Sequence, residues 1–358
     1  MRYLLAPNST LIVRGPASLQ LRNGDATVLA APVEQGKMMI VRRERQIPIE
    51  AKSEVDLELQ LGESGEFFEI EGSTIPKSWT AAADALAEME LGKVLVIGGT
   101  DVGKSTLCAY LTNSMLSKGM RVRVIDGDIG QADIGPPTTI GSAFPSSYIS
   151  SLFELEAESL IFVGNTSPNQ VETPLIDGIR RLLTNKVPAI TLINTDGWIE
   201  DPEAIVYKVR LISAIEPDLI IGISTRNELD PILSGSRARA LRIDASEEVL
   251  KRSRSDRREL RISGYRRFLD GAVTRVFEQQ YVRVRIPKHL QQLPRQELKN
   301  AIVGLLNNEG FLLGIGILID FEKSSLRVYC KSFEDITDIE IGYVKLSTDG
   351  TELEYLTP

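Results

Sequence analysis

Residues 98–105 read Gly-Gly-Thr-Asp-Val-Gly-Lys-Ser and fit the pattern G-x-x-x-x-G-K-[ST], which few folds accommodate. The pattern follows the continuous apolar run Val94–Ile97 and opens a segment of helical character, Lys104–Ser117. In this setting glycines let successive backbone N–H groups point at phosphate oxygens, and the start of the helix adds its positive dipole end. The sequence therefore predicts a phosphate-binding loop between a buried strand and a helix.

The residue types in this loop predict binding of a nucleoside triphosphate together with Mg²⁺; ATP is the expected nucleotide, and GTP stays open as the alternative. Lys104 is expected to bridge the β- and γ-phosphates, and the hydroxyl of Ser105 is expected to ligate the metal. The predicted nucleotide-binding residues are Gly98, Gly99, Thr100, Asp101, Val102, Gly103, Lys104, Ser105 and Thr106. A glycine-rich turn with a chance Lys-Ser pair is the alternative, and the flanking strand and helix argue against it.

A second group of functional residues is expected where the strand-like run Val122–Ile125 ends at Asp126 and Asp128. Ligands of open parallel sheets lie at the carboxyl edge of the strands. One carboxylate there can join the Mg²⁺ shell, and the other can accept a proton from an attacking hydroxyl. Because side chains alternate along a strand, the two carboxylates are expected to face the same way. A strand-end turn rich in Asp and Gly is the alternative interpretation.

The order of elements predicts the fold class. After residue 92 strands alternate with helices, which predicts a mostly parallel α/β sheet with helices on both faces. Before it, short alternating apolar stretches separated by Gly and Asn/Asp turns predict a β-rich region. We therefore expect a β-rich N-terminal domain (1–78), a central P-loop domain (79–280) and a small α+β C-terminal domain (281–358).

Individual elements follow from apolar periodicity. The expected strands of the central sheet are Val94–Ile97, Val122–Ile125, Leu160–Val163, Ala189–Ile193 and Leu219–Ile223. The helices expected around them are Trp79–Leu91, Lys104–Ser117, Glu172–Thr184 and Pro202–Ile215. Two further helices are expected, from Glu247 to about Gln279 and over Arg295–Leu306.

Charge is unevenly distributed along the chain. The net charge of −8 argues against a general nucleic-acid binder. Between Lys251 and Arg267, however, there are eight basic and two acidic residues, so this segment has a net charge of +6. A local cationic element on an acidic body favours a phosphate clamp over a broad duplex-binding face.

Cysteine and histidine usage excludes several kinds of site. Cys108 and Cys330 are expected to be buried small hydrophobes, and the lack of a Cys/His cluster argues against zinc. His289 is the single histidine and no nucleophile motif accompanies it, so acid–base work must fall to carboxylates or lysine.

No apolar run reaches the ~18–20 residues that span a bilayer. A cytoplasmic protein, or a nuclear one in a eukaryote, is therefore expected.

Two subclasses of P-loop protein fit poorly. A GTP-binding switch would carry an N-K-x-D motif, and the nearest candidate, Asn194-Thr195-Asp196, lacks the lysine. A dimerising ATPase would carry a second lysine early in the loop, and residues 98–102 contain none. A kinase is the class that is left.

Five segments together resemble the polynucleotide 5′-hydroxyl kinase family. They are the P-loop itself, the run Asp126-Gly-Asp-Ile-Gly-Gln-Ala-Asp-Ile-Gly-Pro-Pro137, the clasp-like Gly164-Asn-Thr-Ser-Pro168, the element Asn194-Thr-Asp-Gly-Trp198 and the arginine-rich Arg252-Ser-Arg-Ser-Asp-Arg-Arg-Glu259. The three-part layout is also similar to that family. Each motif is weak alone, but five in the same order cover most of the chain.

The resemblance implies roles for individual residues. Asp128 matches the general base, and Arg252 and Arg257 match the lid arginines that stabilise the transferring phosphoryl group. Trp198 is expected to stack on the terminal base. Further substrate contacts are expected from Gln131, Thr166, Ser167 and Arg258. The alternatives are a solvated basic helix face for the arginines, a core-capping tryptophan, and turn chemistry before Pro168 for Thr166 and Ser167.

One residue departs from the family pattern. Asp196 stands where some relatives have a small residue, and a carboxylate there would repel RNA phosphates unless it points away or binds metal. The expected activity is transfer of the γ-phosphate of ATP to the 5′-hydroxyl of RNA, and possible further substrates are 5′-hydroxyl ends of DNA. Partner proteins from RNA processing are a possible addition. Two alternatives stay open: a non-catalytic ATP-binding scaffold of an RNA-processing complex, and a kinase for a nucleoside or other small molecule.

Overall fold

The computed structural model describes residues 1–184 and 189–356. The chain divides into two compact units. The first unit is Met1–Val124, Phe144–Leu155 and Val187–Ser253, and the second is Ile125–Ala143, Glu156–Lys186 and Arg254–Pro358. The three predicted domains are divided differently, because they follow sequence composition, and they stay a prediction.

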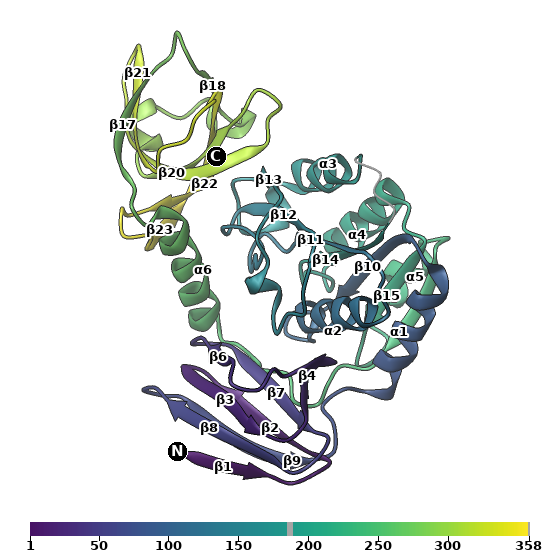
Figure 1. Cartoon of the computed structure of the whole chain (residues 1–358). Helices are drawn as coiled ribbons and strands as arrows, with labels where there is room; N and C mark the ends of the chain where they lie inside the picture. The colour runs from purple at the N-terminus through teal and green to yellow at the C-terminus, as the bar shows by residue number, and fades with distance from the viewer. Residues whose placement is uncertain (185–188, 357–358) are drawn as a thin grey trace. The chain divides into compact units, whose positions relative to one another are not determined.

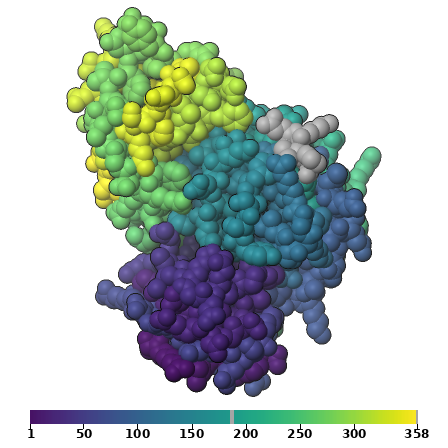
Figure 2. Space-filling view, in the orientation of Figure 1, coloured from purple at the N-terminus to yellow at the C-terminus, as the bar shows by residue number. Residues whose placement is uncertain are grey.

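The N-terminal part of the first unit consists of two antiparallel sheets (Figure 1). One has the order β1-β8-β3-β6, built from Arg2–Leu5, Val55–Leu61, Ala17–Asn23 and Met38–Val41. The other has the order β5-β4-β7-β2-β9, built from Ala31–Pro32, Ala26–Val28, Gln46–Ala51, Ser9–Arg14 and Glu66–Glu71. Alternate residues of β8, such as Val55, Leu57 and Leu59, are buried, as expected of strands with one face on a core. In the space-filling view these N-terminal residues, coloured purple, gather in one body (Figure 2).

A parallel sheet forms the rest of the first unit. Its strands run in the order β11-β14-β10-β15-β16, namely Val122–Gly127, Ile190–Thr195, Gly92–Gly98, Leu219–Ile223 and Arg239–Ile243, and β11 continues into the second unit. The pairs β10–β14, β10–β15 and β15–β16 are parallel. The helices are α1 (Lys77–Met89), α2 (Lys104–Ser117), α4 (Pro202–Ile215) and α5 (Asp230–Ser234), and they pack as the pairs α1–α2 and α4–α5. The predicted α/β fold with a β-rich N-terminal region is confirmed.

The second unit combines the end of β11 with a hairpin, two helices and a C-terminal sheet. The hairpin strands β12 (Thr139–Ala143) and β13 (Ser159–Phe162) are antiparallel, and α3 (Glu172–Leu183) packs on both. Helix α6 spans Arg254–Leu269. The C-terminal sheet has the order β17-β21-β20-β19-β22-β18, with β23 paired to β22. Its strands are Val273–Glu278, Ser325–Cys330, Leu312–Phe321, Ala301–Leu306, Asp338–Leu346 and Arg283–Arg285, with β23 at Glu352–Tyr355.

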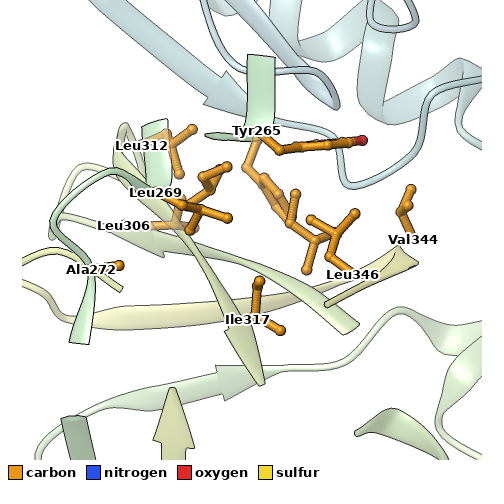
Figure 3. Close-up of a cluster of buried hydrophobic side chains, with 11 residues drawn as sticks. Tyr265, Leu269, Ala272, Leu306, Leu312, Ile317, Val344 and Leu346 are labelled. Atoms are coloured by element: carbon orange, nitrogen blue, oxygen red, sulfur yellow. The ribbon is translucent and has the colours of Figure 1, made fainter. Parts of the chain in front are cut away.

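A hydrophobic cluster joins α6 to this sheet. Tyr265 and Leu269 of α6 point into a group that includes Leu306, Ile317 and Leu346 (Figure 3). Tyr265 is wholly buried. The apolar face of the otherwise basic helix therefore lies on the C-terminal sheet, which leaves the charged residues of its other faces available for polar contacts.

The helix predicted from Glu247 to about Gln279 is wrong at both ends. Helix α6 spans only Arg254–Leu269, Gly271 takes a left-handed φ of 77°, and strand β17 follows at Val273–Glu278. A left-handed glycine commonly ends a helix, and the β-branched residues after it favour a strand that pairs with β21.

The helix predicted over Arg295–Leu306 is also wrong. Arg295–Leu298 form a single 3-10 turn, Asn300 has a φ of 69°, and Ala301–Leu306 form strand β19 between β20 and β22. All six residues of β19 are buried. A short run buried on both faces has no periodicity to separate strand from helix, so only its pairing decides. The described C-terminal sheet therefore lacks the helix expected of an α+β domain.

Candidate functional site

The phosphate-binding loop has the local geometry that its sequence predicts. Strand β10 ends at Gly98, Asp101 and Gly103 take left-handed φ values of 53° and 97°, and α2 begins at Lys104. The Nζ of Lys104 donates to the carbonyl oxygen of Gly99 at 2.7 Å, and the lysine is buried. The ammonium group is thus folded over the loop, and its contact with phosphate oxygens stays a prediction.

The Asn-Thr-Asp-Gly-Trp element contacts this loop directly. Nδ2 of the buried Asn194 donates to the Oγ of Ser105 at 3.3 Å. The Oγ1 of Thr100 donates to the carbonyl oxygen of Gly197 at 3.4 Å, and a Cβ on Gly197 would lie 2.7 Å from the Cα of Thr100. A side chain therefore has no room at position 197. Sequence reasoning assigned Asn194 no task, although its place at the end of a buried strand was a usable signal.

The carboxylate of Asp196 is bonded to two residues of helix α4. Its Oδ2 accepts hydrogen bonds from the hydroxyl of Tyr207 at 2.8 Å and from Nζ of Lys208 at 2.9 Å. The backbone carbonyl of Asp196 accepts a second bond from Lys208 Nζ at 3.0 Å. The carboxylate that departs from the family pattern is therefore buried and neutralised by Lys208. How this carboxylate affects a bound phosphate stays a prediction.

Trp198 is half-buried and held at three points. Its backbone N–H donates to Asp196 Oδ1 at 3.0 Å, and its Nε1 donates to Asp201 Oδ2 at 2.7 Å. Its ring stacks with that of Tyr207 at a centroid distance of 5.9 Å and an interplanar angle of 25°. The indole therefore has a defined orientation. Its predicted role as a stacking surface for a base stays a prediction.

Arg252, predicted as a lid arginine, contacts the phosphate loop through Asp101. The backbone N–H of Arg252 donates to Asp101 Oδ2 at 3.0 Å, and Nη1 lies 3.7 Å from Oδ1. Its Nε donates to the carbonyl oxygen of Glu44 at 3.1 Å. Asp101 thus links the loop to the start of the basic segment, a role that the motif pattern did not reveal.

In the second unit, Asp126 and Asp128 organise the turn after β11. Asp126 is wholly buried, and its Oδ2 accepts hydrogen bonds from the backbone N–H groups of Asp133 at 2.6 Å and Ile134 at 3.3 Å. Its Oδ1 accepts from the N–H of Asp128 at 3.3 Å. Strand β11 ends at Gly127, so side-chain alternation along the strand does not govern the direction of Asp128. The metal role of Asp126 and the base role of Asp128 stay predictions.

The turn at Asp128 contacts the clasp-like segment. Asp128 Oδ1 accepts hydrogen bonds from the N–H groups of Gly130 at 3.2 Å and Gln131 at 3.0 Å. A Cβ on Gly130 would lie 2.6 Å from the carbonyl oxygen of Thr166, so the two backbones touch. The structure therefore brings together Asp128, Gln131 and Thr166, three of the predicted site residues.

The clasp residues are shaped by Asn165, whose Oδ1 accepts from the N–H groups of Thr166 at 2.8 Å and Ser167 at 3.2 Å. Ser167 is exposed. The hydroxyl of Thr166 shares a hydrogen bond of 2.7 Å with the hydroxyl of Tyr355 on β23. Turn chemistry is thus present, as the alternative interpretation expected, and the substrate contacts of Thr166 and Ser167 stay predictions.

Two predicted site residues of α6, Arg257 and Arg258, form hydrogen bonds to Gln131 and Glu352. Gln131 Nε2 donates to the carbonyl oxygen of Arg257 at 3.4 Å. Arg258, whose side chain is 47% exposed, donates through Nη2 to the carbonyl oxygen of Glu352. Arg261 binds both carboxylate oxygens of Glu352, at 2.6 and 2.8 Å. Burial alone would lower the pKa of Arg261, but the hydrogen bonds and charge of Glu352 outweigh it and raise the pKa.

Sequence reasoning missed Glu352, Tyr355, Tyr207 and Lys208. The first two lie on a strand near the C-terminus that no motif marks. Lys208 carried a signal, because it falls at a buried position of the periodic helix Pro202–Ile215, beside Tyr207 and four residues before Ile212. A lysine at such a position needs a buried partner. Cys108 and Cys330 are buried, as predicted, and are not joined in a disulfide.

A buried parallel strand, a loop with a left-handed glycine and a helix that starts at Lys104 place the chain in the class of P-loop nucleotide-binding proteins. Residues 98–271 match the family model described as the mRNA cleavage and polyadenylation factor CLP1 P-loop. The polyribonucleotide 5′-hydroxyl-kinase of Pyrococcus horikoshii is 30% identical, in a match that covers 83% of this chain and 97% of the relative. The chain belongs to the family of the polyribonucleotide 5′-hydroxyl-kinases.

Two further relatives have names of the same kind, and a solved structure shares the fold. The kinase of the same name from Pyrococcus abyssi is 32% identical over 74% of this chain and 90% of its own length. Clp1 of Gallus gallus is 30% identical over 50% of this chain and 45% of its own length. The structure of Clp1p in complex with Pcf11p superimposes with a TM-score of 0.75, over 96% of this chain and 97% of that one, at 12% identity. This last likeness shows the fold. Within the described residues, no helix is long and apolar enough to cross a membrane.

Proposed function

We propose that this protein is an RNA 5′-hydroxyl kinase that transfers the γ-phosphate of ATP to the 5′ end of RNA. The observation that carries the proposal is the contact between the phosphate loop and the tryptophan element. Gly197 lies against Thr100 without room for a side chain, and the oriented indole of Trp198 follows it directly. A base stacked on that indole would present its 5′ end beside a phosphate-binding loop. Family membership supports ATP as donor, and the names of the relatives favour RNA.

The transfer needs few chemical groups. Asp128 takes the proton of the RNA 5′-hydroxyl, whose oxygen bonds to the γ-phosphorus while the bond from that phosphorus to the β–γ bridging oxygen breaks and ADP leaves. Lys104 supplies positive charge to the phosphates. We assign Arg252 and Arg257 to the charge that grows on the transferring group, and Arg258 with Gln131, Thr166 and Ser167 to the RNA. Most of the catalytic effect then comes from positioning and electrostatics.

The residues present fit a magnesium ion carried with ATP. Mg²⁺ prefers oxygen ligands and is usually held by one or two protein groups together with substrate phosphates. In line with this, the described residues contain no group of three or more His, Cys, Asp or Glu that could hold a metal alone. The amide of Asn194 donates to Ser105 Oγ, which leaves that oxygen as an acceptor toward a cation. We propose that Ser105 and Asp126 hold the ion, which when bound neutralises phosphate charge.

The decisive experiment measures transfer of labelled γ-phosphate from ATP to four acceptors: a 5′-hydroxyl RNA oligonucleotide, its DNA counterpart, the 5′-phosphorylated RNA and a free nucleoside. Label on the 5′-hydroxyl RNA, absent with Lys104→Ala, is the expected result. Stronger labelling of the nucleoside would favour the small-molecule kinase. Retention of ATP without transfer to any acceptor would favour the scaffold. In that case the protein would be compared with Clp1p, which was solved in complex with Pcf11p.

A further inference from the structure

Lys208 is a lysine with no exposed surface, on the inner face of helix α4. Its Nζ donates to two atoms of one residue, Oδ2 and the backbone carbonyl oxygen of Asp196, at 2.9 and 3.0 Å. The Asp196 side chain is itself only 6% exposed. Removing two charges from water is costly, and apolar residues of similar volume often stabilise a fold as well or better. An ion pair with both partners buried therefore indicates a role beyond stability.

The geometry around Asp196 shows what the pair holds in place. Oδ2 is fixed by Lys208 and by the hydroxyl of Tyr207, while Oδ1 accepts the backbone N–H of Trp198. The carboxylate thus sets the direction of the chain between Asp196 and Trp198. That short stretch contains Gly197, whose backbone lies on Thr100 of the phosphate loop. Tyr207 makes two contacts: its hydroxyl donates to Asp196, and its ring stacks with the indole of Trp198.

We infer that Asp196, Tyr207 and Lys208 are positioning residues that set the Trp198 indole relative to the phosphate loop, and so set where the 5′-terminal nucleotide of RNA is held. This inference rests on the proposed function. It assigns a task to helix α4, which contributes none of the predicted site residues. It also explains why a carboxylate can occupy position 196, since its charge is matched by Lys208 inside the protein.

The first test is Tyr207→Phe, which keeps the ring and removes one hydroxyl. Asp196 stays paired with Lys208, so the fold should survive. We expect the KM for 5′-hydroxyl RNA to rise about fivefold, the equivalent of one net hydrogen bond, with kcat and the KM for ATP nearly unchanged. The matched control is Tyr3→Phe, which removes a tyrosine–carboxylate hydrogen bond of 2.7 Å to Glu69 in the N-terminal sheets. The control should leave every kinetic constant unchanged.

The second test removes both charges with the double variant Asp196→Asn/Lys208→Met. Lys208→Met alone leaves a buried unpaired carboxylate and can fail to fold, whereas the double variant should keep a thermal midpoint near that of the wild type. We expect its KM for RNA to rise about tenfold or more, because the loss of charge-assisted hydrogen bonds loosens the chain at Trp198. A folded double variant with the KM of the wild type for RNA would overturn the inference, as would a Tyr207→Phe that lowers kcat alone.

A third measurement needs no substrate and separates this inference from the proposed function. The protein has two tryptophans, and Trp79 is 1% exposed, so acrylamide quenching of fluorescence reports mainly on Trp198. We expect quenching to increase in the double variant and to stay unchanged in Tyr3→Phe. If the wild type phosphorylated no RNA, the proposed function would fail while the quenching result stood. Unchanged quenching in the double variant would instead refute the positioning role by itself.

Discussion

Each unit of the molecule contains a buried carboxylate with a cationic partner, and the two differ in how far the partner reaches toward water. Asp196, in the first unit, pairs with a lysine that is wholly buried. Glu352, in the second, pairs with Arg261 at 16% and Arg258 at 47% side-chain exposure. The first pair is closed and directs a backbone turn. The second extends from the interior to the surface and holds helix α6, which carries the predicted lid arginine Arg257.

This difference shows that burial of a charge alone does not define its task. A closed pair can only set local geometry, because neither partner is open to an incoming ligand. A pair with a half-exposed arginine can both anchor a helix and present charge to a substrate. The following changes separate these two roles, from the largest expected effect to the smallest.

Asp128→Asn should have the largest effect, because it removes the proposed base while keeping the size of the side chain. Its carbonyl oxygen can still accept the N–H groups of Gly130 and Gln131, so the turn should persist. We expect phosphoryl transfer to fall by about 10²- to 10⁴-fold with ATP binding retained, measured by label transfer and by nucleotide titration. Near-normal transfer would show that the base lies elsewhere.

Lys208→Met should cost the most stability of the changes to the two pairs. It leaves the Asp196 carboxylate buried without its cation, and we expect the free energy of unfolding to fall by about 3–5 kcal/mol. Urea denaturation measures the change. A loss below that of Glu352→Gln would contradict the view that the closed pair is the more sensitive of the two.

Glu352→Gln should cost less stability and affect the RNA step. The amide can keep one contact with Arg261, and the partly exposed arginines regain water, so we expect a loss of about 1–3 kcal/mol. Helix α6 should become more mobile at its Arg258 end, which amide hydrogen exchange would detect. The KM for RNA should rise, and added salt should raise it further. Unchanged exchange in α6 would remove the anchoring role of Glu352.

Asp338 provides a third pair, with both arginines at the surface, and should give the smallest effect. Burial would raise the pKa of Asp338, but hydrogen bonds from Thr337, Arg283 and Arg285 outweigh it and lower the pKa below its ordinary value. The stabilising contribution is therefore present above the unfolded value and is lost as the pH falls through the lower folded value. Because the arginines are 70% and 50% exposed, Asp338→Asn should cost about 1 kcal/mol at neutral pH and nothing in strong acid, by thermal unfolding. A constant difference at every pH would contradict this account.

The elements that local pattern predicted best lie around the phosphate loop. Helices Lys104–Ser117 and Pro202–Ile215 and strand Leu219–Ile223 have the expected bounds. Their boundaries depend on neighbours in sequence: a glycine at the start of one helix, and Asp-Pro at the start of the other. Ala301–Leu306 was misread as helix because a short, fully buried apolar run is ambiguous until its strand partners are known.

The amino-acid sequence by itself determined the phosphate loop, the alternating α/β order and the family resemblance, because each depends on residues close together along the chain. Tertiary structure alone decided that Lys208 neutralises Asp196, that Asp101 holds Arg252, and that Glu352 holds Arg261. The last two pairs join residues 151 and 91 positions apart. No local pattern encodes such partners. A buried charge needs an oppositely charged or hydrogen-bonding group close in space, and which residue supplies that group depends on how the strands and helices pack.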